Sequence, residues 1–287
     1  MRLTFRGRKQ SAAGRADPER RGADPHRLGA DLRVPIAALL DQDRVANAFL
    51  RSELRLGAAL DGWWGLGERD QLRALLMTGS VVVPWIPDPG DIPAFAGVLR
   101  QHPPRLIIGP APAVRALTAL IAPRQRPVEV RDPQPVMVLD GSIPKRSVPI
   151  RLGRRDDLDR LTVAAAAMHR EEMGVDPLAL DPVGWRHRMA TLIDRGWSYL
   201  LVEDGEIAFK VELSAWTPEV IQLQGVWTKP ELRRRGVATA ALTAVCAELL
   251  TEVPVCSLYL NSYNDAAMRL YRRIGFRQVG EFATVIF

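Results

Sequence analysis

The segment ELRRRGVATAALTAV, residues 231–245, places three arginines before a glycine and an alanine-rich apolar run. A strand is expected to end at Thr228, so the segment is predicted to be a loop that leads into a helix opening near Gly236. The first N–H groups of a helix have no acceptor inside the helix and lie at the positive end of its dipole. Such a junction can hold a phosphate or pyrophosphate. The alternative is a solvated charge run before a core helix, and this segment alone does not decide between the two.

A second segment, NDAAMRLYRRIGF, residues 264–276, also follows a predicted strand. Asn264, Ala267 and Tyr271 lie on nearly one side of a helix, because spacings of three, four and seven residues almost coincide in angle. Tyrosine supplies a phenolic proton donor with an ordinary pKa near 10. The alternative for Tyr271 is a packed aromatic on an amphipathic helix.

Together the two segments resemble the cofactor and catalytic motifs of the GNAT superfamily of acyl-CoA-dependent N-acyltransferases. The motif Gln/Arg-x-x-Gly-x-Gly/Ala stands at residues 233–238, and Asn-x-x-Ala-x-x-Leu-Tyr-x-x-x-Gly-Phe stands complete at residues 264–276. The resemblance covers about residues 148–287. The whole chain is also similar to actinobacterial-type two-domain members, whose N-terminal half is a degenerate GNAT-like domain.

The resemblance implies direct transfer of an acetyl group from acetyl-CoA to an amine in a ternary complex. Backbone groups of Val226, Trp227 and Thr228 would pair with the pantetheine arm, and an N–H there would polarise the thioester carbonyl. Tyr271 matches the family position that protonates the departing thiolate. The residues expected to bind the rest of the donor are Arg233, Arg234, Arg235, Gly236, Val237, Ala238, Thr239 and Asn264.

The general base is less defined. Peptide N-terminal acetyltransferases of the superfamily often carry a Glu in the strand before the Asn motif, and Tyr259 stands there in this chain, which weakens that assignment. The remaining carboxylates are Glu171 and Glu172, at the end of a predicted helix, and Glu212 on a predicted central strand; Glu172 and Glu212 are the candidates for catalysis. A solvated helix end is the alternative for the first two, and an ordered water could also remove the proton of the amine.

Both halves of the chain show a similar order of predicted helices and strands, which suggests two copies of one α+β fold. We expect tandem GNAT-like domains, each a mixed, mostly antiparallel sheet flanked by helices. The expected parts are a disordered basic tail (1–27), a degenerate N-terminal domain (28–141) and a catalytic domain (148–287). In the first half, RLIIGPAPAVRAL, residues 105–117, lacks the Arg-x-x-Gly-x-Ala pattern, and its prolines remove N–H donors. The donor site is therefore assigned to the second half alone.

Charge and composition exclude several other classes of protein. The net charge is +6, but the tail holds eight basic against three acidic residues, so the remainder is nearly neutral and predicts no nucleic-acid partner for the folded part. No apolar run is long enough to span a bilayer and no secretory h-region opens the chain, so a cytoplasmic protein without a membrane partner is expected. The two cysteines are expected in the core, and the four histidines show no metal-ligand spacing, so no metal is predicted.

Two other functions stay open at this stage. A Fem-type aminoacyl transferase also pairs two GNAT-like domains, but a tRNA donor does not need the pyrophosphate motif. A non-catalytic acyl-CoA-sensing module would keep binding without turnover, and an intact Tyr271 favours turnover. The acceptor is a small-molecule or a peptide or protein amine, and its identity does not follow from the sequence.

Overall fold

The computed structural model of this protein describes residues 24–144 and 147–287. Most of the predicted basic tail, residues 1–23, lies outside the described residues. His26 and Arg27 lie within them and form a short strand, β1 (His26–Arg27), which pairs with β2 of the N-terminal sheet. None of the helices in the described ranges is both long and apolar enough to cross a membrane.

The N-terminal part combines a small antiparallel sheet with helices on its flanks. The sheet has the order β1, β2 (Trp63–Glu68), β3 (Gln71–Met77) and β4 (Val83–Trp85). The other elements are η2 (Ala30–Leu32), α1 (Arg33–Leu40), η3 (Asp41–Asp43), α2 (Ala48–Arg55), η4 (Pro89–Phe95), α3 (Ala96–Gln101), β5 (Leu106–Pro110), α4 (Ala111–Ile121) and β6 (Glu129–Asp140).

The C-terminal part begins with β7 (Arg151–Leu152) and contains most of a larger mixed sheet. Its helices are η5 (Arg155–Asp157), α5 (Leu158–Met173), α6 (Pro177–Leu180), α7 (Pro182–Asp194), η6 (Pro230–Leu232), α8 (Val237–Leu249) and α9 (Asp265–Ile274). Its strands are β8 (Ser198–Glu203), β9 (Glu206–Trp216), β10 (Ile221–Thr228), β11 (Val255–Tyr259) and β12 (Arg277–Ile286). Strands β8 and β9 form a hairpin around Asp204-Gly205, with both residues at positive φ.

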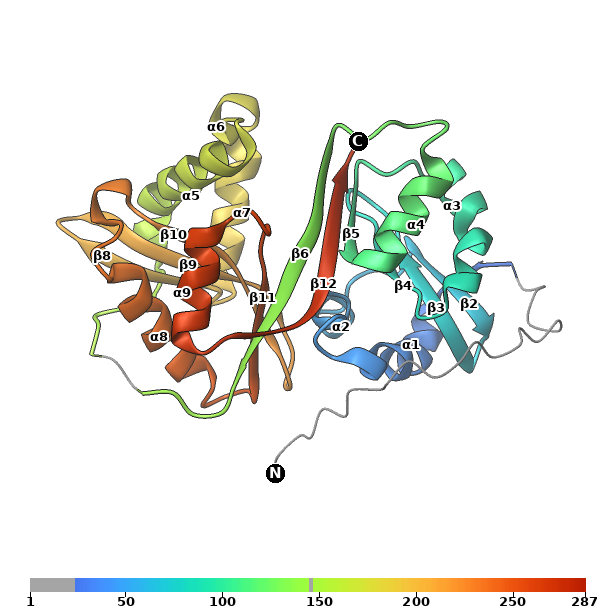
Figure 1. Cartoon of the computed structure of the whole chain (residues 1–287), viewed down its shortest axis with the longest axis horizontal. Coiled ribbons are helices and arrows are strands. Elements are labelled where there is room, and N and C mark those ends of the chain that lie inside the picture. The colour runs from blue at the N-terminus through green and yellow to red at the C-terminus, as the bar shows by residue number, and fades with distance from the viewer. Residues whose placement is uncertain (1–23, 145–146) are drawn as a thin grey trace.

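The two halves share strands. The larger sheet has the order β5-β12-β6-β11-β10-β9-β8-β7, so β6 from the first half lies between β11 and β12 of the second. The C-terminal strand β12 in turn pairs with both β6 and β5. Figure 1 shows β6 and β12 side by side between the two halves of the molecule. The expected mixed, mostly antiparallel α+β architecture is therefore confirmed, and β5 and β6 of the first half form part of the larger sheet, while β1–β4 form a sheet of their own.

The helices of the C-terminal part cover opposite faces of this sheet. Trp227 and Lys210 are partners in the β9–β10 register, and the indole of Trp227 bonds to Glu171 on α5, so this pair faces α5. Val211, next along β9, is paired with Tyr199, whose pKa is raised by burial and by the nearby Glu248 of α8. Successive residues of a strand point to opposite faces. Helix α8 therefore lies on the face opposite α5.

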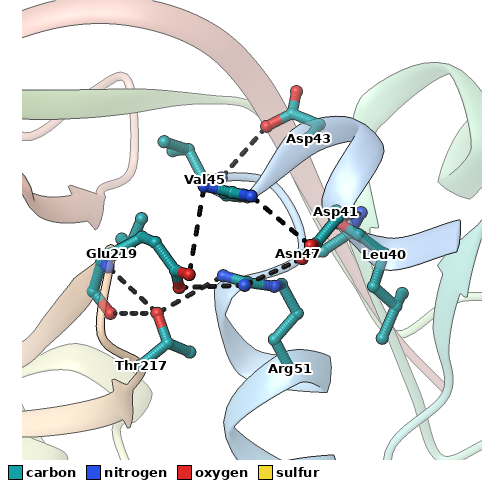
Figure 2. A network of polar contacts seen from close by, with 10 residues as sticks. Leu40, Asp41, Asp43, Val45, Asn47, Arg51, Thr217 and Glu219 are labelled. Carbon is teal, nitrogen blue, oxygen red and sulfur yellow. Dashed lines mark hydrogen bonds and ion pairs between the residues drawn. The ribbon is translucent and has the colours of Figure 1, made fainter. Parts of the chain in front are cut away.

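Helix α2 of the N-terminal half packs on the α5 face and is held there by polar contacts. Figure 2 shows Arg51 of α2 pointing toward Glu219 and Thr217, in the turn between β9 and β10, and toward Asp41. Its guanidinium lies 2.9 Å from Glu219 Oε2 and 2.8 Å from Asp41 Oδ1. Below these contacts, Val45 and Ala48 pack with buried residues of the shared sheet. The position of α2 is thus set by the second half of the chain.

Strands β10 and β11 are parallel neighbours that separate soon after they meet. Only Ile221↔Cys256 and Gln222↔Ser257 are paired in the described register, and β10 then runs on to Thr228 without a partner on that side. The separation opens the middle of the sheet and exposes one backbone edge of β10, to which an extended ligand could add its own hydrogen bonds.

Candidate active site

The loop after β10 presents a row of backbone donors, as the sequence predicts. Gly236 is the N-cap of α8 with φ 83°, and Arg234 also has a left-handed φ of 62°. The first amide of the helix to find a backbone acceptor is Ala240, which donates to Gly236 O at 3.0 Å. The N–H groups of residues 234–239 precede it, at the positive end of the helix dipole, and are available to an anion.

The side chain of Arg233 makes contacts within the protein. Its guanidinium donates to both carboxylate oxygens of Glu171, at 2.9 and 2.6 Å, and to Thr228 O at 2.9 Å. Glu171 also accepts from the indole of Trp227 at 3.2 Å. Arg233 therefore ties the end of α5 to the end of β10, and the charge left for a ligand at this loop comes from Arg234 and Arg235, both exposed.

A bulge in β10 lies at the point where the two strands separate. The register shifts between Gln224 and Trp227, and Gly225 has φ 60°. A Cβ at Gly225 would come within 2.9 Å of Glu212 Oε2 and 3.1 Å of Lys210 Nζ, so only glycine fits. The carbonyl of Gly225 accepts from Lys210 Nζ at 3.0 Å. The bulge turns the backbone of residues 225–228 toward the open edge of β10.

Glu212, one of the two candidate bases, is already paired. Its Oε1 accepts from Lys210 Nζ at 2.7 Å, and both side chains are buried, at 5 % and 0 % exposure. A buried carboxylate that is already bonded to an ammonium group is engaged in that ion pair, and parting the two would leave both charges buried without a partner. Glu212 is therefore better suited to shaping the site than to removing a proton.

Glu172, the other candidate, has the electrostatics of a base. The residue as a whole is exposed, but the protein atoms that surround its carboxyl desolvate that group and raise its pKa. The carboxylates of Glu171 and Glu212 add to this increase, while Lys210 and Arg131 oppose it. A carboxylate whose pKa is raised toward neutrality accepts a proton more readily while remaining ionised.

Tyr271 lies on α9 with 7 % of its surface exposed and its ring 5.7 Å from that of Phe276. Burial raises its pKa, and the charge of Glu172 and the thiol of Cys246 raise it further. The phenol is therefore within electrostatic reach of Glu172. Such a phenol stays protonated at neutral pH and can act as a donor.

Asn264 is placed as the N-cap of α9. Its Oδ1 accepts from the Ala267 N–H at 3.1 Å, and Met268 N donates to its carbonyl. The Asn-x-x-Ala spacing thus has a local structural role, because an N-cap satisfies a helix donor that would otherwise be unpaired. Its expected contact with the donor stays a prediction.

Two charged residues of the site were not singled out from the sequence. Lys210 stands in FKVEL, where the alternation with Glu212 on one strand face was a usable signal. Arg131 stands on β6 of the first half, and its guanidinium lies 2.8 Å from Met173 Sδ, next to Glu172. Nothing local to Arg131 indicates this position, because it depends on the exchange of β6 between the halves.

The corresponding junction in the first half has no phosphate loop. Strand β5 ends at Pro110, and Pro110 is also the N-cap of α4, which has proline at its start. Strand and helix meet directly, and the prolines supply no N–H groups. Only the second half offers an anion cradle at this place in the fold.

Comparison with known proteins agrees with this division. Residues 167–276 match the family model described as "Acetyltransferase (GNAT) family", and residues 62–161 match "Domain of unknown function (DUF4081)". No curated protein matches the chain.

Solved structures show the same fold at low sequence identity. An acetyltransferase from the GNAT family of Colwellia psychrerythraea aligns with a TM-score of 0.61 and 14% identity, over 93% of this chain and 99% of that one. A putative GNAT acetyltransferase from Novosphingobium aromaticivorans has a TM-score of 0.57 and 21% identity, over 86% and 96%. A tandem GNAT protein from the clavulanic acid biosynthesis pathway has a TM-score of 0.57 and 13% identity, over 92% and 97%. Residues 167–276 thus match the GNAT acetyltransferase family and residues 62–161 match DUF4081, and the chain as a whole has a tandem GNAT-like fold.

Proposed function

We propose that the C-terminal half transfers the acetyl group of acetyl-CoA directly to an amine in a ternary complex. The observation that carries the proposal is the row of N–H groups at residues 234–239, placed at the end of a strand whose edge is open. The row suits a pyrophosphate, and the open edge of Val226, Trp227 and Thr228 suits an extended amide-containing arm. Acetyl-CoA has both parts in this order.

The acid and base roles follow from the two raised pKa values. Glu172 removes a proton from the amine as its nitrogen bonds to the acetyl carbonyl carbon. The C–S bond breaks, and Tyr271 gives its proton to the departing thiolate. The proton held by Glu172 then returns to Tyr271 through solvent, so the products are an N-acetyl amine and the free thiol of CoA. An N–H at the β10 bulge polarises the carbonyl.

In this proposal Glu212 and Lys210 position the site and take no part in proton transfer. Lys210, held by its ion pair with Glu212, donates to the Gly225 carbonyl and so holds the bulge that presents residues 226–228. Arg233 acts in the same way at the other end of the strand, through Thr228 O and Glu171. The donor's phosphates are bound by backbone groups of residues 234–239, with added charge from Arg234 and Arg235.

The proposal is tested by free-thiol release from acetyl-CoA across classes of amine, with acetyl-CoA binding measured by calorimetry. Tyr271→Phe is expected to lower kcat by about 10²–10³-fold with little change in acetyl-CoA affinity. The matched control is Tyr199→Phe, which removes another buried phenol, on the α8 face beside Glu248.

Gly236→Glu is expected to abolish acetyl-CoA binding, because it puts a negative side chain at the mouth of the cradle. Gly57→Glu is its control, since Gly57 has a similar φ of 78° and equally open surroundings in the other half. If acetyl-CoA does not bind, or if Gly236→Glu binds it as the wild type does, the proposal is wrong. Binding without thiol release for any amine would favour the acyl-CoA-sensing module.

A further inference from the structure

A cleft of about 300 Å³ lies between the two halves, on the α5 face of the shared sheet. One wall is α2 of the N-terminal half, and the other is α7 and the residue that follows it. The floor is formed by β9 and β10. The lining residues that matter here are Phe49, Glu53, Arg188, Arg195, Leu213 and Gln224.

The floor of this cleft adjoins the proposed reaction centre. Gln224 directly precedes Gly225, the residue at the bulge in β10, and is paired in register with Glu212. The backbone assigned to the donor begins two residues further on, at Val226. A molecule in the cleft therefore lies beside the strand segment that the proposal assigns to the donor.

Two arginines in the cleft lack a carboxylate partner among the residues that the structure describes. Arg188 lies 5.9 Å above the Trp185 ring, and Arg195 lies 5.0 Å above the Trp197 ring. Arg186, on the same helix, is by contrast paired with Asp159 at 2.9 Å. Desolvation is the main cause that lowers the pKa of the nearby His169 imidazole, and the positive charge of Arg188 lowers it further. The cleft thus holds two guanidinium groups that lie over aromatic rings. Neither forms an ion pair with an acidic side chain among the described residues.

The opposite wall comes from the N-terminal half and is joined to the sheet by polar contacts. Phe49 and Glu53 stand on α2, two residues before and after Arg51, whose ion pair with Glu219 joins the helix to the β9–β10 turn, as Figure 2 shows. The neighbouring Ser52 Oγ accepts from Trp216 N at 3.0 Å. The N-terminal half therefore contributes one wall of the cleft at a set distance from α7.

We infer that this cleft is the acceptor site, and that the acceptor is a small amine that carries a carboxylate. The inference rests on the proposed acetyl transfer. The volume lies at the low end of ligand pockets and suits a molecule of amino-acid or dipeptide size. Arg188 and Arg195 bind the carboxylate, since a guanidinium fork matches a carboxylate geometrically. Phe49 and Leu213 contact the apolar body, and the amine points toward Gln224 and the bulge.

The test compares matched acceptors that differ in one group: leucine, leucinamide and 3-methylbutylamine, and likewise phenylalanine, phenylalaninamide and phenethylamine. We expect kcat/KM for thiol release to be at least about tenfold higher for the amino acid than for its amide. The amine of an amino-acid amide has a lower pKa than that of the free amino acid, so a larger fraction of it is unprotonated at neutral pH. A preference for the amino acid would therefore reflect binding of its carboxylate and not a more reactive amine.

In the double variant Arg188→Gln/Arg195→Gln, kcat/KM for the amino acid and for its amide are expected to lie within about threefold of each other. Arg195→Glu alone is expected to favour the amide or the amine over the amino acid. Arg186→Gln is the matched control from the same helix and should keep the wild-type preference. Thermal unfolding of each variant checks that it is folded, and calorimetry checks that acetyl-CoA still binds.

These measurements separate the two claims. If acetyl-CoA binds but no carboxylate-bearing amine is acetylated, or if the preference is absent or survives the double substitution, the inference about the acceptor is wrong while donor binding stands. If acetyl-CoA does not bind to the wild type, the proposed function itself is wrong. A carboxylate preference lost only in the arginine variants supports both.

Discussion

Lys210 and Glu212 stand two residues apart on β9 and are buried side by side, with Lys210 Nζ 2.7 Å from Glu212 Oε1. Lys210 also donates to the Gly225 carbonyl at 3.0 Å. One buried ion pair therefore joins β9 to the bulge of β10. A buried charge that loses its partner is costly, whereas replacing both partners with apolar residues need not be.

Lys210→Met is expected to lower the free energy of unfolding by about 3–5 kcal/mol, because Glu212 would be left buried and unpaired. Lys210→Met/Glu212→Leu should recover most of this loss. Urea denaturation measures both. The control is Lys229→Ala, which removes an exposed ion pair with Glu206 and should change the free energy of unfolding far less, because solvent screens that pair. Equal stability of the single and double variants would contradict the coupling.

Glu172→Gln is expected to lower kcat/KM by about 10²–10⁴-fold and to remove the acid limb of its pH profile. The wild-type limb should lie above the ordinary range of glutamate, because desolvation raises the pKa of Glu172 and activity requires its ionised form. In Glu212→Gln the acid limb should remain, since Glu212 is assigned no proton transfer. An unchanged limb in Glu172→Gln would remove Glu172 as the base.

The raised pKa of Glu172 also affects the stability of the fold. A carboxyl whose pKa is higher in the folded state stabilises the fold below its unfolded pKa, and this contribution is lost as the pH rises through the folded value. Glu172→Gln is therefore expected to be at least as stable as the wild type at pH 7. Thermal unfolding at pH 5 and pH 8 checks this, and a clear loss of stability at pH 8 would contradict it.

Gly236→Ala is expected to lower the free energy of unfolding by about 1 kcal/mol, because its φ of 83° is unfavourable for a residue with Cβ. Arg234→Gly should change the free energy of unfolding by less than about 0.5 kcal/mol. Glycine removes the backbone strain at φ 62°, and this gain offsets the greater conformational freedom that glycine gives the unfolded chain. Both should weaken acetyl-CoA binding, measured by calorimetry. Gly57→Ala has the same backbone penalty and should leave acetyl-CoA binding unchanged.

Residues 148–287 expressed alone are expected not to fold, because β6 would be missing between β11 and β12. The edges of both strands would then lie open, a known cause of aggregation. Residues 28–147 and 148–287 produced together should form a soluble complex with a cooperative unfolding transition. A monomeric, cooperatively unfolding 148–287 fragment, judged by circular dichroism and gel filtration, would contradict this.

The sequence by itself determined the local parts of the site. The strand–loop–helix junction at residues 228–237, the N-cap at Asn264 and the place of Tyr271 on a helix all depend on contacts within a few residues, which propensity and spacing encode. The α+β class also followed from the order of elements in each half. The catalytic and binding roles of these residues stay predictions, as do the domain limits at residues 141 and 148.

Tertiary structure alone decided how these parts meet. The exchange of β6 and β12, the place of Arg131 beside Met173 and the cleft between α2 and α7 join residues far apart in the chain. No local pattern specifies such a pairing, because strand partners are chosen by packing and hydrogen bonding across the whole sheet. The distinction between Glu172 and Glu212 has the same origin, since their environments differ through the neighbours that the fold brings to each of them.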